Sequence, residues 1–421
     1  MRQVVISIVV LVVCCFVTVG KAYPETITTT SPWVNMPYPK DDPRWAEAFT
    51  HWDRRADTKE VMAAVSIFDE LGAQKPDQIV PQLWVLRSNY LAAMRNRKKR
   101  DFYVKKAIAA GDRALKIEPD NIYATYWRAA SIVLLRDPTD EEYLQIRAFN
   151  ARFKNRREIP APKDDPLWAK AMKLWDTRFT EQDVKYAEAK LGGKTKLVEE
   201  DVKSGEAKGA AVVAVFEQLE KKYPARIEPK LWLARANYWT SQVCIEQKKR
   251  ATWSKAAASW GHKAIEMEPR NPAANFWTAV ALSEYGGSTS LIVLTRYSRE
   301  IGRQMQFVTE EDPGYMYGGF SRFFAGAIAF AGELVIKVAE LLGFPKELIE
   351  RLTVYAVKTD PDYLQNYYMM GLLYLKTDRK VEARKMFDHL LKADPVALKY
   401  QEAENRLIQF VAKLAMKDLF E

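Results

Sequence analysis

Apolar residues recur every three or four positions over two long stretches of the chain, from Asp42 to about Leu135 and from Asp165 to Tyr285. This spacing gathers apolar side chains on one face of an α-helix, whereas a half-buried strand would alternate at every second residue. Each stretch opens with an Asp-Pro pair, which favours a helix start because aspartate caps free amides and proline suits the first helical position. The pattern therefore predicts an all-α protein.

The second stretch repeats the first. Residues 40–46 return at 163–169 with a single difference, and residues 83–90 share five of eight positions with residues 231–238. The offset is 123 residues at the start, 148 in the middle and 150 at the end. Self-similarity of this kind is typical of repeat proteins, in which helical hairpins stack into a solenoid.

The C-terminal third shows which hairpin is repeated. Residues 364–397 fit the 34-residue tetratricopeptide (TPR) unit, in which large and small residues interlock two antiparallel helices. The matching positions are Tyr367, Met370, Gly371, Tyr374, Ala383, Phe387 and Pro395. We therefore predict a tetratricopeptide-like helical-hairpin solenoid with an internal duplication.

The same patterns divide the chain into regions. A signal peptide (1–22) and a Pro/Thr-rich tether (23–40) precede a first TPR-like module (41–136), a connector (137–162), a second TPR-like module (163–285) and a C-terminal helical region (286–421) that holds the TPR unit at 364–397. The second module carries an insertion at 180–208, rich in glycine, lysine and glutamate, which predicts a surface excursion.

The N-terminus has the features of an export signal. A short basic start precedes an apolar run over residues 4–19, and the small residues Gly20 and Ala22 predict cleavage after Ala22. The run is shorter than the roughly 20 residues of a full membrane span. A lipid anchor on Cys14 or Cys15 is less favoured, because neither is preceded by a small residue. We expect a periplasmic protein.

Charge and aromatic content change this picture little. The net charge is +10, and basic runs occur at 95–100 and 248–250. These runs occupy equivalent helix–helix turns, where cations complement the helix dipole, so nucleic-acid binding is not expected. Eight of the twelve tryptophans fall at equivalent repeat positions, which favours packing between helices over a ligand cage.

No enzymatic constellation is recognisable in the sequence. His51, His262 and His389 are scattered, and no spacing of cysteine and histidine fits a metal site. We predict neither a catalytic residue nor a cofactor. Cys244 is the one cysteine left after cleavage, and we expect it to be a buried thiol.

A candidate binding surface follows from polar residues that the duplication repeats. They are Arg87, Asn89 and Tyr90 in the first module and Arg235, Asn237 and Tyr238 in the second. On one face of a solenoid they would line a concave groove, and Tyr317 and Arg322 of a glycine-rich segment would close one end. Arginines in such a groove suit a small carboxylate solute or an acidic partner, whereas solvated or capping roles are the alternative.

The residues already quoted resemble a known family. The Trp-Asp-x-Arg helix ends, the segment from Tyr317 to Arg322 and the closing TPR unit look like the T-component (TatT-like) family of TRAP transporters, most clearly over residues 300–397. Members of that family are associated with periplasmic solute uptake beside a substrate-binding protein, and they are commonly lipoproteins.

The resemblance implies a non-enzymatic scaffold that binds the periplasmic substrate-binding protein of a TRAP-type system, with a small organic-acid-like solute as a second candidate ligand. The alternative is a general protein–protein adaptor in bacterial envelope assembly. Small residues at 325–331 permit close helix approach, within one chain or in a homo-oligomer.

Overall fold

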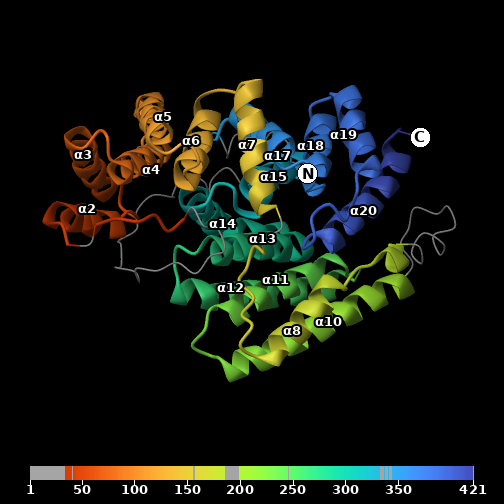
Figure 1. Cartoon of the computed structure of the whole chain (residues 1–421). Helices are drawn as coiled ribbons and strands as arrows, with labels where there is room; N and C mark the ends of the chain where they lie inside the picture. The colour runs from red at the N-terminus through yellow and green to blue at the C-terminus, as the bar shows by residue number, and fades with distance from the viewer. Residues whose placement is uncertain are drawn as a thin grey trace.

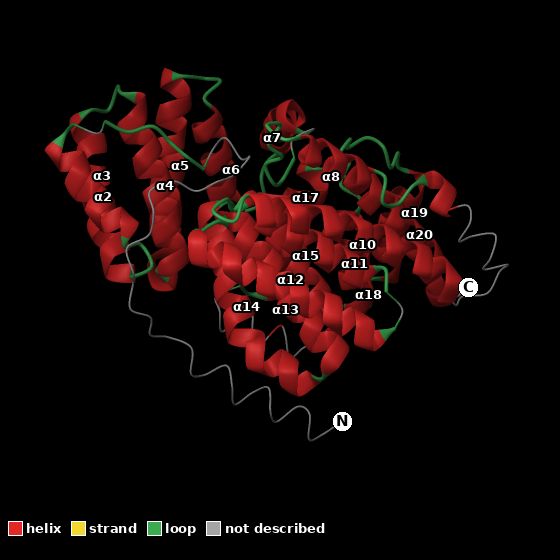
Figure 2. Ribbon diagram, turned by 90° about the horizontal axis from the view of Figure 1, so that it is seen from below, coloured by secondary structure: helices red, strands yellow, loops and turns green. Residues whose placement is uncertain are grey.

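The computed structural model describes residues 34–39, 41–154, 157–184, 199–244, 246–331, 336, 340 and 344–420. Over these residues the chain is built from helices and loops and contains no strand, which confirms the all-α prediction (Figure 2). The predicted signal peptide and its cleavage site lie outside the described residues.

The first module consists of five α-helices that follow one another in space. They are α2 (Pro43–Asp53), α3 (Thr58–Gln74), α4 (Ile79–Arg95), α5 (Arg100–Ile117) and α6 (Ile122–Leu135), with a short 3₁₀ helix (Arg97–Lys99) between α4 and α5. Asp42 caps α2 by accepting a hydrogen bond from the Arg44 amide at 2.9 Å. Asn121 caps α6 in the same way, through the Ala124 amide at 3.0 Å.

The second module repeats these helices in the same order. They are α8 (Pro166–Asp176), α10 (Glu199–Lys222), α11 (Glu228–Gln242), α12 (Gln247–Met267) and α13 (Pro272–Thr289). Their caps are repeated as well, with Asp165 on the Leu167 amide at 2.8 Å and Asn271 on the Ala274 amide at 3.1 Å. The internal duplication is thus present in the helices and in the residues that start them.

The C-terminal region continues the stack with α14 (Leu291–Glu311), α15 (Tyr315–Ala331), α17 (Lys346–Thr359), α18 (Gln365–Lys376), α19 (Lys380–Lys392) and α20 (Glu402–Phe420). Helices α18 and α19 form the predicted TPR unit. A Cβ atom at Gly371 would lie 3.0 Å from the Phe387 ring, so the small residue is what lets the two helices interlock. Helix α15 packs its small-residue face inside the chain, where Gly326 meets Met369 of α18.

The three regions share one hydrophobic core, which extends from Val34 to Ala412. Figure 1 shows the first module on the left, the second module below and the C-terminal helices running from the centre to the right. Helix α14 lies at the centre, beside α13 of the second module. The repeated tryptophans belong to this core: Trp45, Trp168 and Trp232 are at most 1% exposed, as expected for packing residues.

The structure adds detail within three of the predicted regions. The connector 137–162 contains helix α7 (Asp140–Phe153), because a capping box at Thr139 starts it and Tyr143, Ile146 and Phe149 give it a buried face. The end of the tether is packed on the first module, with Val34 1% exposed.

The insertion at 180–208 is helical at its end, since residues 199–208 extend α10. Lys208 there pairs with Asp183 at 2.6 Å. Residues 185–198 lie outside the described part of the chain. In the residues that are described, no helix combines the length and apolar character needed to cross a membrane.

Candidate functional site

A buried arginine surrounded by three indole rings forms the centre of the first module. The Arg87 guanidinium lies 5.4 Å from the centroid of Trp52, 5.7 Å from Trp84 and 5.0 Å from Trp127. These rings come from α2, α4 and α6, so the helix stack itself builds the cage. A guanidinium in this position is attracted by the ring faces but has lost most of its water, and it therefore needs an acceptor.

That acceptor is Glu311, the last residue of α14. Its carboxylate accepts hydrogen bonds from Arg55 Nε at 2.9 Å, Arg87 Nη2 at 3.1 Å and Arg270 Nε at 2.5 Å. Burial alone would raise the pKa of Glu311, but the three arginines outweigh burial and hold this pKa well below its ordinary value. We call Trp52, Arg55, Trp84, Arg87, Trp127 and Glu311 the first arginine box.

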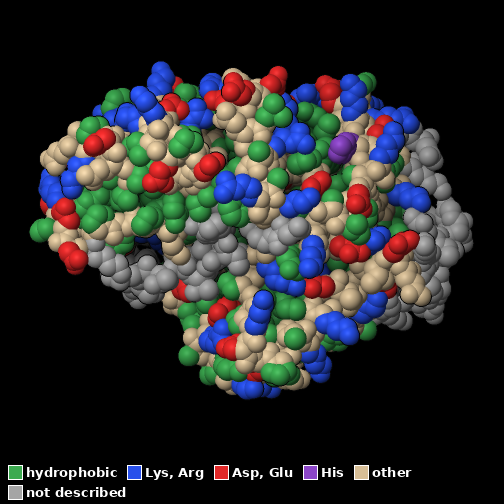
Figure 3. Space-filling model, viewed as in Figure 1, with side chains coloured by type: hydrophobic (Ala, Val, Ile, Leu, Met, Phe, Trp, Pro, Cys, Tyr) green, Lys and Arg blue, Asp and Glu red, His purple; other side chains and the backbone are tan. Residues whose placement is uncertain are grey.

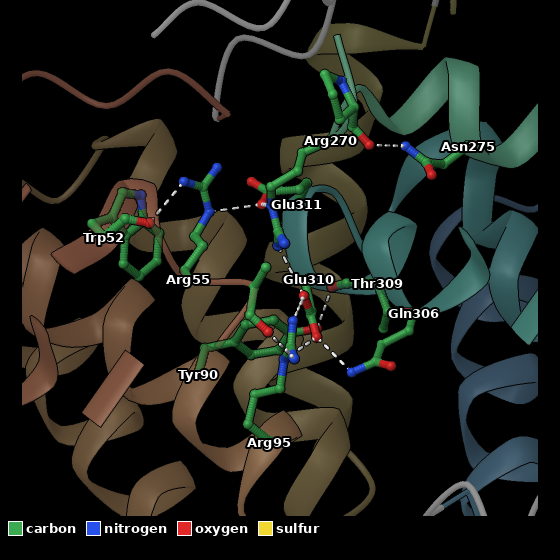
Figure 4. A network of polar contacts seen from close by, with 12 residues as sticks. Trp52, Arg55, Tyr90, Arg95, Arg270, Asn275, Gln306, Thr309, Glu310 and Glu311 are labelled. Atoms are coloured by element: carbon green, nitrogen blue, oxygen red, sulfur yellow. Dashed lines mark hydrogen bonds and ion pairs between the residues drawn. The ribbon is translucent and has the colours of Figure 1, made fainter. Parts of the chain in front are cut away.

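The neighbouring Glu310 extends this network. It accepts from Arg95 Nη2 at 2.7 Å, from Arg270 Nη2 at 2.8 Å and from Gln306 Nε2 at 2.8 Å. Figure 4 shows Arg55 and Arg270 directed at Glu311, and Arg95 directed at Glu310. Since Arg270 belongs to the second module, the network joins both modules to α14.

The second module contains the same arrangement at equivalent positions. The Arg235 guanidinium lies 4.9 Å from the ring centroid of Trp175, 5.6 Å from Trp232 and 5.1 Å from Trp277. The carboxylate that pairs with Arg235 belongs to Glu404 of α20, which accepts a hydrogen bond from Arg235 Nη2 at 3.0 Å.

Arg178 completes this second cage. It lies 3.5 Å from the Trp175 ring centroid, and its Nη2 pairs with Glu404. Burial, more than the charge of Arg235, lowers the pKa of Arg178 to about 10, although Glu404 opposes the shift. We call Arg178, Trp175, Arg235, Trp232, Trp277 and Glu404 the second arginine box.

The duplicated cages thus have one chemistry: two arginines held by tryptophans recognise a glutamate carried on a later helix. Each cage is also tied to the loop that precedes its module. Trp84 Nε1 donates to the Pro37 carbonyl at 2.9 Å, and Trp232 Nε1 donates to the Pro160 carbonyl at 2.8 Å. Arginine and carboxylate form charge-assisted hydrogen bonds, which are among the stronger contacts in proteins.

The predicted residues of the first module are buried and bonded within the protein. Asn89 is fully buried and donates to Asp69 at 2.8 Å and to the Val85 carbonyl at 2.9 Å. Tyr90 donates its hydroxyl to the Thr309 carbonyl at 2.9 Å. Together with Arg87, these residues hold α4 against α3 and α14.

The predicted residues of the second module behave similarly. Asn237 is buried and donates to the Leu233 carbonyl at 2.8 Å within its own helix. Tyr238 is half-buried, and its ring lies 5.7 Å from that of Trp277. Arg235 belongs to the second arginine box.

The glycine-rich segment forms a left-handed turn at the start of α15. Met316, Tyr317 and Gly318 have φ values of 53°, 54° and 83°. Successive left-handed residues are costly for side chains other than glycine, so the surrounding structure must hold them. Arg322 Nη1 does this by donating to the Met316 carbonyl at 3.0 Å and to Asn366 Oδ1 at 2.9 Å.

The eight predicted residues therefore do not line one open groove, and that expectation is wrong. Arg87, Asn89, Tyr90, Arg235, Asn237, Tyr317 and Arg322 are at most 5% exposed. Arg87 and Arg235 belong to the two boxes and Tyr317 and Arg322 to the turn, whereas Asn89, Tyr90 and Asn237 form hydrogen bonds within the packed helices. Arg322 meets backbone carbonyls and Asn366 at the start of α15, and does not close the end of a groove.

Sequence reasoning missed several residues of these boxes. Arg55 and Arg178 stand three residues after Trp52 and Trp175, so the repeated Trp-Asp-x-Arg pattern carried their signal. Glu311 and Glu404 have no common sequence context, and only the fold brings them to the cages.

A small cavity lies between α6, α7, α15 and α17. Its volume is about 60 Å³, and its lining includes Tyr90, Asn150, Tyr355 and Asp360. This is less than half of the roughly 150 Å³ of an engineered cavity that binds benzene, which is too little for an organic acid of ordinary size.

The remaining candidate groups are engaged in the fold. Cys244 is buried, and burial raises the pKa of its thiol to about 11. His51 contacts Glu60 at 2.6 Å, and His262 contacts Glu300 at 2.5 Å. Within the described ranges, no group of three or more histidine, cysteine, aspartate or glutamate side chains is arranged to hold a metal ion.

Comparison with known proteins adds little beyond the fold class. No family model matches the chain, and none of the curated proteins matches it. Among solved structures, a human IFIT1 dimer with PPP-AAAA is similar at 10% identity, over 83% of this chain and 72% of that chain, with a TM-score of 0.29.

Two further solved structures are similar at 12% identity. Yeast Tom70 covers 90% of this chain and 97% of its own, with a TM-score of 0.21. The P58(IPK) TPR domain covers 89% of this chain and 99% of its own, with a TM-score of 0.19. Because these scores are low, the TPR-like assignment rests on the chain's own hairpins and on the unit at 364–397.

Proposed function

We propose that this protein is a non-enzymatic periplasmic scaffold, an accessory component of a TRAP-type uptake system that binds the substrate-binding protein. The TPR-like hairpin stack is an architecture suited to protein–protein interaction. The family resemblance of residues 300–397 supports the transport role. The observation that carries the scaffold role is the TPR unit at 364–397, whose two helices interlock at Gly371 and Phe387.

The geometry favours a protein partner over a small carboxylate solute as the main ligand. Glu311 and Glu404 already occupy the guanidinium groups that would bind such a solute. A solute would have to displace one of these glutamates. In the proposed system the solute therefore stays with the substrate-binding protein, and the scaffold contacts that protein.

The surface is compatible with a protein partner. On the face shown in Figure 3, basic and acidic side chains are interspersed. Arg95, which the sequence places in a basic run, is directed inward to Glu310. Among its described residues, the face shown therefore has no continuous basic patch of the kind that binds nucleic acid.

Isothermal titration calorimetry tests the proposal directly. The chain from Tyr23 onward is titrated with the substrate-binding protein encoded beside a TRAP permease in the same organism, and a binding protein of an unrelated uptake system is the control. We expect a dissociation constant on the order of 1 μM, or about 8 kcal/mol. Absence of binding at about 100 μM would overturn the transport role, and co-purification with an envelope-assembly complex would favour the adaptor alternative.

A further inference from the structure

The two arginine boxes differ in how deeply they enclose their glutamate. The Glu311 side chain in the first box is 1% exposed. The Glu404 side chain in the second box is 16% exposed, although Arg178 and Arg235 around it are only 1% and 2% exposed. The Glu404 side chain is therefore partly accessible to solvent, whereas its Oε2 atom is buried against Arg178.

Both boxes have more hydrogen-bond donors than their resident glutamates use, since Arg87 Nε of the first box also has no acceptor. The Nε atoms of Arg178 and Arg235 are buried and donate to no acceptor, and neither does the side-chain amide nitrogen of Gln401. Buried donors left without an acceptor are costly. The second box therefore retains unused donors beside those that hold Glu404.

Helix α20 does not depend on the box for its own position in the C-terminal region. Asn405 accepts from the Leu364 amide at 3.1 Å and donates to the Asp362 carbonyl at 2.9 Å. Gln409 Nε2 donates to the Leu390 carbonyl at 2.9 Å. Glu404 can therefore leave the box while α20 stays attached to α18 and α19.

The duplication identifies the class of ligand. Both boxes hold the same group, a glutamate carboxylate presented by an α-helix, at the last residue of α14 and in the first turn of α20. The tryptophan cage and the paired guanidiniums recur with it in each module. Such a cage is suited to a carboxylate on an ordered helix.

We propose that the second arginine box is an exchangeable carboxylate site, in which a glutamate-bearing helix of a partner protein replaces Glu404. The exchange opens the seam between the second module and α20, where Glu404 and Gln401 meet Arg235. This inference rests on the geometry of the box and not on the transport role.

A labelled peptide of residues 396–416, used as the probe, tests the exchange by fluorescence anisotropy. The hosts are the chain from Tyr23 onward and its Glu404→Gln variant. We expect at least tenfold tighter binding to the variant, about 1.4 kcal/mol, because its own helix no longer competes with a charged carboxylate. A peptide carrying Glu404→Gln should lose binding at least tenfold.

A matched peptide controls for net charge. Glu402→Gln removes the same charge, but Glu402 pairs with Arg406 of its own helix at 2.8 Å, so this peptide should bind like the unmodified one. A second host, Phe410→Ala, loosens the contact of α20 with Val184 without changing the box, and it serves if the Glu404→Gln chain does not fold.

Two results would overturn the proposal. One is equal binding of the unmodified and Glu404→Gln peptides, and the other is failure of the unmodified peptide to bind either variant host. The chain could instead form a concentration-dependent dimer that dissociates when the peptide is added. That result would assign the site to α20 of a second copy and would also overturn the assignment to a partner protein.

Discussion

Buried arginines join separate parts of this structure through ion pairs. A guanidinium removed from water is tolerated when carboxylates and carbonyls take its hydrogen bonds. Arg87 shows the balance: burial lowers the pKa of its guanidinium to about 10, although Glu311 opposes the shift. The tryptophan faces add attraction, but the carboxylate supplies the opposite charge.

Glu311→Gln should therefore be among the most damaging single changes. It leaves Arg55, Arg87 and Arg270 without their shared charge, which we expect to cost about 3–5 kcal/mol of unfolding free energy at pH 7. Chemical denaturation measures this cost. Glu141→Gln, an exposed change on α7, is the control and should stay within about 0.5 kcal/mol of the wild type.

The destabilisation caused by Glu311→Gln should depend on pH. The pKa of Glu311 is lowered in the folded state, whereas an unfolded glutamate takes up its proton near pH 4.3. On acidification the unfolded state therefore binds this proton before the folded state does. The stability from Glu311 is thus present above that pH and is lost as pH falls towards the folded-state pKa. The difference in unfolding free energy between the wild type and Glu311→Gln should decrease below about pH 5. A constant difference from pH 7 to pH 3 would contradict this.

At the scale of elements, the turn at the start of α15 holds three successive left-handed residues. Gly318 has a φ of 83°, and a Cβ atom there would lie 2.6 Å from the Ala356 Cβ atom. Met316 and Tyr317 adopt left-handed values without being glycines, and Arg322 binds both of their carbonyls. The turn is therefore held by packing and hydrogen bonds against its local preference.

Gly318→Ala should destabilise the protein by at least about 1–2 kcal/mol, the cost of a left-handed residue with a Cβ atom, before the clash with Ala356 is added. Gly287→Ala is the matched control, since a Cβ atom there meets nothing within 4 Å in helix α13. The melting temperature of Gly318→Ala should be lower than that of the wild type, and that of Gly287→Ala should be higher. A neutral Gly318→Ala would show that the turn relaxes freely.

Much of this architecture follows from local sequence. The Asp-Pro starts, the repeated tryptophans and the TPR spacing around Gly371 encode helices, duplication and hairpin type, because these features depend on neighbouring residues. Helix α7 was missed because prolines and basic residues around it suggested a connector. The boxes were missed because Glu311 lies 224 positions from Arg87, and Glu404 lies 169 positions from Arg235. Sequence spacing carries no signal for such long-range pairs.

At the scale of the whole molecule, the duplication explains how the C-terminal region is attached to both modules. Each module builds a cage of indole rings and arginines, and a helix from the C-terminal region inserts a glutamate into each cage. Arg270 adds a third link by reaching from the second module into the first box. The two modules and the C-terminal region are thereby joined by buried ion pairs as well as by a common apolar core.

A double-mutant cycle on Arg235 and Glu404 tests this account most directly. The unfolding free energies of the wild type, Arg235→Met, Glu404→Gln and the double variant give the coupling between the second module and α20. We predict a coupling of about 1–3 kcal/mol, as found for contacting charged residues. Additive effects, within about 0.3–0.5 kcal/mol, would contradict the claim that the box joins the second module to the C-terminal helix.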